Sequence, residues 1–170
     1  MGNVTTIIQI EAPSEKVFAF AISEKMNDVW KEWTETKWIS DGPVGVGSIS
    51  HFVGQGSWSN MGEWDMEVTE FVKNKKMTMR TIGAAKVNAT DSMVLEPTTK
   101  GTKITYSENY KVSYSVLGKL IDKLKVSKEM EKNNRKMLEN LKKLLRRNLK
   151  VKRKDANILS LFFISKVNII

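Results

Sequence analysis

The order of apolar patterns along the chain constrains the fold more than any single motif. Residues 4–11 are typical of a strand, and residues 36–112 repeat the two-residue alternation of strands between glycine-containing turns. Residues 116–148 carry an apolar stripe at the helical period. A curved antiparallel sheet with one long helix across it buries both apolar faces and tends to leave a cavity between them. The sequence therefore predicts an α+β protein that can enclose a small molecule.

Two short helices are expected between the first strand and the rest of the sheet. Pro13 suits the first turn of a helix, because its missing N–H would have no intrahelical partner there. Apolar side chains within residues 17–22 give this helix a buried face, and a second helical piece is expected around Val29. The next strand is predicted to begin at Trp38, and residues 54–62, rich in Gly, Ser and Asn, are predicted to form a loop.

The composition is typical of a soluble globular protein, and it excludes several kinds of functional site. Of the 170 residues, 41% are apolar and 28% are charged. No cysteine is present, which excludes a disulfide framework, a thiolate nucleophile and a cysteine metal site. The first residues lack a basic stretch followed by an apolar segment, so no secretory signal is expected and a cytoplasmic location is predicted.

Three segments in succession carry a family resemblance. They are I-x-I-E-A-P-S-E-K-V-F from Ile8 to Phe18, G-P-V-G-V-G-S from Gly42 to Ser48, and L-E-P-T-T-K-G-T-K-I-T-Y from Leu95 to Tyr106. Together with the long terminal helix, this succession resembles the START-like (SRPBCC) superfamily of polyketide cyclase/dehydrase and lipid-transport proteins, which have the Bet v 1-like helix-grip fold. The likeness covers about residues 4–147.

The resemblance implies a helix-grip domain over residues 1–148, in which a curved antiparallel sheet of six to seven strands wraps around the C-terminal helix. Members of the superfamily bind lipids, sterols, polyketides or other hydrophobic molecules, and a minority are enzymes. The superfamily shares no single catalytic motif, so the resemblance assigns no catalytic residue. No cofactor is predicted.

Strand alternation and the helical stripe predict which side chains point inward. For any one of these side chains, a place in a solid core and a place in a cavity lining are equally compatible with the pattern. Methionine is flexible and polarizable, so the nine Met residues favour a lining that adapts to irregular apolar ligands. The predicted lining consists of Trp64, Met66, Val68, Met77, Met79, Met93, Leu95, Ile104, Tyr106, Leu117, Leu120, Ile121 and Leu124.

Weak candidates for acid–base chemistry are His51, Tyr106 and Glu108. His51 is the only histidine, and the sequence places no carboxylate beside it, so a surface or structural role is favoured. Tyr106 and Glu108 share a strand face, where they either orient a bound molecule or lie at a wet strand end. A lone histidine without cysteine makes a zinc site improbable, and the acidic residues of 63–67 fall on a solvated face, so no metal is predicted.

The net charge of +9 belongs to the end of the chain. Residues 1–118 hold 12 Lys/Arg and 14 Asp/Glu, whereas residues 119–154 hold 15 and 4. A solvated helix face is the favoured interpretation. Weak contact of the Lys142–Lys154 region with an anionic membrane surface comes second, because a basic then apolar tail follows at residues 149–170. Nucleic-acid binding is disfavoured, since no recognised motif accompanies the charge.

The predicted function is binding, and by extension transport, of a hydrophobic small molecule or lipid between the sheet and the terminal helix. One alternative is a polyketide cyclase/dehydratase-like enzyme that uses the same cavity, which requires two acid–base groups to converge there. A further alternative is a protein-interaction or chaperone-regulating module that uses the outer sheet face, which predicts a small or absent cavity.

Overall fold

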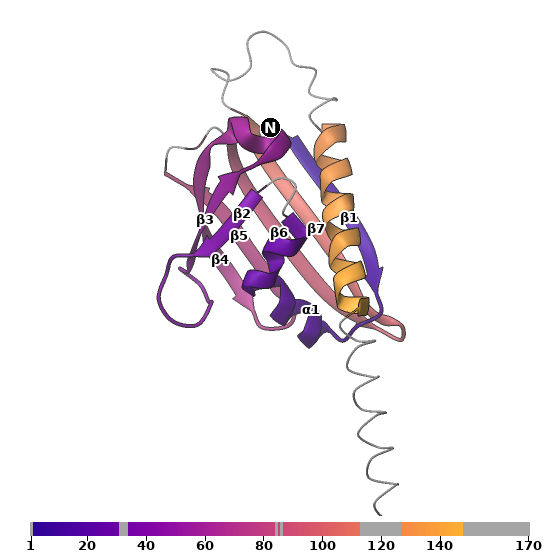
Figure 1. Cartoon of the computed structure of the whole chain (residues 1–170). Coiled ribbons are helices and arrows are strands. Elements are labelled where there is room, and N and C mark those ends of the chain that lie inside the picture. The colour runs from indigo at the N-terminus through magenta and orange to yellow at the C-terminus, as the bar shows by residue number, and fades with distance from the viewer. Residues whose placement is uncertain (1, 31–33, 84, 86, 113–126, 148–170) are drawn as a thin grey trace, which may run out of the picture.

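Seven antiparallel strands form one sheet that curls around a C-terminal helix (Figure 1). The computed structural model describes residues 2–30, 34–83, 85, 87–112 and 127–147 of the chain. The elements are β1 (Gly2–Ile10), α1 (Ser14–Ala21), the 3-10 helix η1 (Glu24–Met26), α2 (Asn27–Trp30), β2 (Thr34–Trp38), β3 (Ile49–Gly54), the 3-10 helix η2 (Gly56–Met61), β4 (Glu63–Val72), β5 (Lys76–Ile82), β6 (Val87–Thr98), β7 (Gly101–Val112) and the C-terminal helix (127–147).

The strand order is β1-β7-β6-β5-β4-β3-β2, so the first two strands of the chain lie at opposite edges of the sheet. The first strand pairs with the last, and α1, η1 and α2 carry the chain from the β1 edge to the β2 edge (Figure 1). The predicted α+β helix-grip fold, with two short helices after the first strand, is therefore confirmed.

Strand β4 shows how the local pattern fixes a face of the sheet. Met66 and Val68 are buried, whereas the intervening acidic residues lie on the opposite, wetter face. The pairing of β4 with β5 shifts between Val68 and Glu70. An irregularity of this kind bends a strand and increases its twist, which favours the curl of the sheet.

Two local predictions were wrong. Trp38 ends strand β2 instead of beginning the next strand. The inward positions of β2 begin with Thr34 and Thr36, and threonine does not produce the apolar alternation that marks a half-buried strand. The predicted loop at 54–62 contains the short helix η2.

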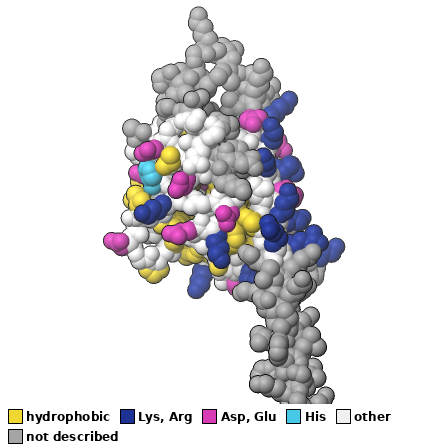
Figure 2. All heavy atoms as spheres, viewed as in Figure 1, with side chains coloured by type: hydrophobic (Ala, Val, Ile, Leu, Met, Phe, Trp, Pro, Cys, Tyr) yellow, Lys and Arg dark blue, Asp and Glu magenta, His cyan; other side chains and the backbone are white. Residues whose placement is uncertain are grey.

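The C-terminal helix packs on the concave face of the sheet and against α2. It buries Met137, Leu138 and Leu141, and the Asn140 side chain donates to the Val29 carbonyl oxygen at 3.4 Å. Figure 2 shows Lys and Arg side chains gathered on the side of the molecule where this helix lies. The part of the predicted helix at 116–126 lies outside the described residues, and no helix within the described ranges is long and apolar enough to cross a bilayer.

Most of the buried apolar side chains in the described ranges fall into two clusters. The larger cluster joins α1, the C-terminal helix, β6 and β7, and includes Phe18 and Ile104. The smaller cluster is built on Met66, Val68 and Met79 of β4 and β5. The C-terminal helix belongs to the larger cluster and β4 and β5 carry the smaller one, and space remains between the two clusters.

Gly101, the first residue of β7, combines a φ of 121° with a close approach to the β1–α1 junction. A Cβ atom at this position would collide with the carbonyl oxygen of Ile10 and the backbone nitrogen of Ala12. Only glycine adopts this conformation readily, and only glycine leaves room for the neighbouring backbone.

We therefore expect Gly101→Ala to lower the free energy of unfolding by roughly 1–3 kcal/mol, because backbone strain and a backbone clash act together. Gly45→Ala is the matched control, since a Cβ there meets nothing within 4 Å. Urea denaturation of both variants measures the difference. Equal stability of the two variants would contradict the close packing at Gly101.

Candidate binding cavity

A cavity of about 380 Å³ lies between the concave face of the sheet, the short helices and the C-terminal helix. This volume falls within the range of roughly 300–1,000 Å³ that is usual for small-molecule sites. Eight of the nine Met residues of the chain line it. These are Met26, Met61, Met66, Met77, Met79, Met93, Met130 and Met137. The lining is therefore mostly apolar and rich in side chains that adapt their shape.

Six of the predicted lining residues lie along this cavity, namely Trp64, Met66, Met77, Met79, Met93 and Tyr106. Val68, Leu95 and Ile104 do not line it. Their side chains are at most 3% exposed and belong to the two apolar clusters, where other side chains pack against them. Leu117, Leu120, Ile121 and Leu124 lie outside the described residues.

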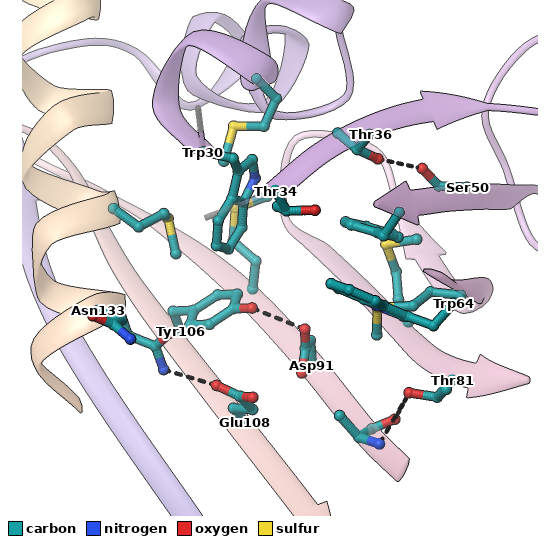
Figure 3. Close-up of a pocket in the computed structure, with 18 of the residues that line it drawn as sticks. Trp30, Thr34, Thr36, Ser50, Trp64, Thr81, Asp91, Tyr106, Glu108 and Asn133 are labelled. Atoms are coloured by element: carbon teal, nitrogen blue, oxygen red, sulfur yellow. Dashed lines mark hydrogen bonds between the residues drawn. The ribbon is translucent and has the colours of Figure 1, made fainter. Parts of the chain in front are cut away.

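The sequence interpretation found Tyr106 and Glu108 but missed other polar residues of the lining. Thr36 and Ser50, from the neighbouring strands β2 and β3, share a hydrogen bond of 2.7 Å between their hydroxyl groups (Figure 3). Asp91 on β6 was also missed. A usable signal existed, because Asp91 has the same strand parity as Met93, which was predicted to point inward.

Asp91 and Glu108 face each other across strands β6 and β7, where they are directly opposed in the register. The Tyr106 hydroxyl donates to Oδ2 of Asp91 at 2.9 Å (Figure 3). The side-chain amide of Asn134, on the C-terminal helix, donates to Oε2 of Glu108 at 3.0 Å. Glu108 is 7% exposed, and Oδ1 of Asp91 is buried without a hydrogen-bond partner among the described residues.

Burial is the main electrostatic influence on this acidic pair. Burial raises the pKa of Asp91 well above its usual value, and the nearby charge of Glu108 raises it further, against the effect of the Tyr106 hydrogen bond. Burial also raises the pKa of Glu108, against the effect of the Asn134 hydrogen bond. The pKa of Tyr106 is raised by burial first and then by the two carboxylates. The pair therefore retains a proton to higher pH than an exposed carboxyl group does.

His51 lies apart from this pair. Its strand neighbours Ser50 and Phe52 line the cavity, so alternation puts His51 on the outer face of the sheet. Its Nδ1 atom is 2.7 Å from Oδ1 of Asp65, and its Nε2 atom is 3.6 Å from Oε2 of Glu63. Figure 2 shows the single histidine at the surface among acidic side chains.

The structure therefore separates His51 from Tyr106 and Glu108, and it places carboxylates beside His51 that the sequence did not indicate. Within the described ranges, no group of three or more His, Asp or Glu side chains is arranged to hold a metal ion.

A seven-stranded antiparallel sheet that grips a C-terminal helix around an apolar cavity defines a helix-grip protein. The family described as polyketide cyclase / dehydrase and lipid transport matches residues 1–146, and the chain belongs to this family.

Solved structures are similar over most of their length. A protein of Thermus thermophilus is 22% identical with a TM-score of 0.70, and the match covers 85% of this chain and 97% of that one. Aha1 of Colwellia psychrerythraea, whose dimer was solved in solution, is 20% identical with a TM-score of 0.60 and coverages of 85% and 96%. Ara h 8.0201 is 10% identical with a TM-score of 0.63 and coverages of 85% and 97%. No curated protein matches the chain in sequence.

The raised pKa of Asp91 predicts a specific dependence of stability on pH. Above about pH 4, the unfolded carboxyl ionises while the folded one keeps its proton, so the folded state binds more protons. The free energy of unfolding then falls by about 1.4 kcal/mol per pH unit for each extra proton, until the folded group ionises as well. Asp91→Asn should reduce this slope and gain stability relative to the wild type as pH rises.

Urea denaturation at a series of pH values measures the slope. An unchanged slope in Asp91→Asn would show that burial does not perturb this carboxyl group.

Proposed function

We propose that this protein binds a hydrophobic small molecule or lipid in the cavity between the sheet and the C-terminal helix, and by extension carries it. The observation that carries the proposal is a cavity of about 380 Å³ whose lining includes eight Met side chains. Desolvation against such a lining supplies affinity. At about 25 cal/mol per Å², burying roughly 200 Å² of apolar ligand surface gives about 5 kcal/mol before association costs are subtracted.

Ala89 offers a way to fill the cavity without disturbing the sheet. It lines the cavity, and its contacts with the Thr81 hydroxyl use only its backbone atoms. A phenylalanine side chain at this position would occupy ligand space while those two hydrogen bonds remain.

Ala89→Phe is expected to weaken binding of a neutral apolar dye such as Nile red by at least about tenfold, equivalent to about 1.4 kcal/mol. Ala19→Phe makes the same change on an exposed face of α1 and should bind like the wild type. Fluorescence titration gives the affinities, and native mass spectrometry tests whether a hydrophobic molecule co-purifies. A wild-type protein that binds neither dye nor cellular lipid would overturn the proposal.

A second candidate is an enzyme of cyclase or dehydratase type that acts on a molecule held in the same cavity. The observation that favours it is the convergence of Tyr106, Glu108 and Asp91, three titratable groups with raised pKa values, in one apolar site. A carboxyl group whose pKa is raised by burial keeps its proton to higher pH, which suits it to donate a proton. His51 takes no part in this version, because it lies on the outer face.

Mass spectrometry of the molecules extracted from wild-type and Glu108→Gln proteins separates the two candidates. A binding protein should yield the same molecule from both. An enzyme blocked at its proton donor should yield a molecule that differs from the wild-type product, for a dehydratase by one water.

The remaining partner predictions stand as proposals. Contact of the Lys142–Lys154 region with anionic membranes rests on the basic side chains of residues 142–147 and on the sequence beyond them. Co-sedimentation with phosphatidylserine vesicles at low salt, lost at high salt, is the measurement that checks it. The cytoplasmic location and the interaction-module alternative likewise remain predictions.

A further inference from the structure

We propose that the ligand of this cavity is an organic cation, a protonated amine on an apolar or aromatic body, with its ammonium group held by Asp91 and Glu108. This inference rests on the proposed binding function and specifies its ligand class. It goes beyond a general hydrophobic ligand, because it predicts which charge the cavity accepts.

The charged side chains along the cavity have one sign. Among the described lining residues, the charged ones are Asp91, Glu108 and Glu129, and none is Lys, Arg or His. The chain as a whole carries a net charge of +9, so this acidic lining runs against the overall composition. A fatty-acid carboxylate or a phosphate group would meet like charges here at short range, whereas a cation would not.

One oxygen of the acidic pair also lacks a hydrogen-bond donor, and a bound cation would supply one. Tyr106 satisfies Oδ2 of Asp91, and Asn134 satisfies Oε2 of Glu108, but Oδ1 of Asp91 is buried without a hydrogen bond among the described residues. A buried carboxylate oxygen without a donor is costly. An ammonium group has up to three N–H donors and no acceptor, which fits the carboxylate oxygens of the pair.

The elements packed around the pair bring no competing cation within the part of the chain that the structure describes. On β1, the residues opposite Glu108 and Tyr106 are the buried, uncharged Val4 and Thr6. On β5, Met79 is opposite Asp91. The C-terminal helix presents Asn133 and Asn134, together with the exposed Glu129. Tyr106 also lies beside the pair, and it is neutral when protonated.

The charge of the pair matches one ammonium group. Two carboxyl groups directly opposed on neighbouring strands cannot both ionise easily, so they tend to share one proton and carry one negative charge. Binding of a single cation would neutralise that charge. A divalent metal would need more ligands than the pair offers.

Aromatic rings complete the site. Trp30, Trp64 and Tyr106 line the same cavity and surround the space beside Asp91 (Figure 3). The faces of such rings attract organic cations, most strongly where water is excluded. The same rings pack against the apolar body of the ligand.

The test compares three probes with one ring system and different charge. These are 2-(1-naphthyl)ethylamine, 2-(1-naphthyl)ethanol and 1-naphthylacetate, titrated into the full chain by calorimetry near neutral pH. We expect the amine to bind at least about tenfold more tightly than the alcohol, and the carboxylate to bind most weakly. Affinity for the amine should rise with pH as the pair passes from its neutral to its singly charged form, while affinity for the alcohol stays level.

Asp91→Asn and Glu108→Gln should each weaken the preference for the amine, and the double variant, which leaves no carboxyl in the pair, should abolish it while keeping affinity for the alcohol. Glu67→Gln removes the same charge from the outer face, where Glu67 pairs with Arg80, and should keep the wild-type preference. Circular dichroism verifies that each variant is folded.

The outcomes distinguish this inference from the function on which it rests. If the alcohol or Nile red binds and the amine is not preferred, the cation proposal is wrong and the binding function stands. If none of these probes binds to folded wild-type protein, both are wrong. A preference for the amine that survives in the double variant would also overturn the assignment of the site.

Discussion

The pairing of β6 with β7 is the constraint on which the rest of the structure depends. The two strands pair without a shift from Val87↔Val112 to Thr98↔Gly101, and β7 also holds β1 on its other side. A slip of one residue would turn every inward side chain of one strand to the outer face. This single register buries Ile104 and Leu95 in the core and brings Asp91 opposite Glu108 in the cavity.

The cavity follows from a division of the apolar interior. The C-terminal helix and α1 pack tightly over β6 and β7, whereas the β4–β5 end of the sheet has its own cluster with the stacked rings of Phe52 and Trp64. The space between them is bordered by methionines, which tolerate imperfect packing better than branched side chains do. A single solid core would have been more stable, so the incomplete closure is consistent with a binding function.

Charge is segregated between the inside and the outside of the molecule. The exposed face of the C-terminal helix is basic, while the cavity beneath the same helix contains only acidic charged groups among its described lining residues. The buried carboxyl groups are retained at a cost in desolvation that an all-apolar lining would avoid. Their hydrogen bonds to Tyr106 and Asn134 offset only part of that cost. For this reason Asp91 and Glu108 are the residues that say most about the class of ligand.

Alternation and helical period are local properties of the chain, so the order of most elements and the faces of the strands could be predicted from the sequence, and the family resemblance added the helix-grip fold. It identified Trp64, Met66 and Met79 as inward-facing, and it found Tyr106 and Glu108 as polar groups on one strand face. Which inward residues border a cavity and which, such as Val68, lie in solid core became clear from the three-dimensional packing alone. The position of Asp91 opposite Glu108 and the position of His51 on the outer face beside Asp65 were not predicted. Both depend on the register between strands, and the cavity itself depends on how closely the helix approaches the sheet.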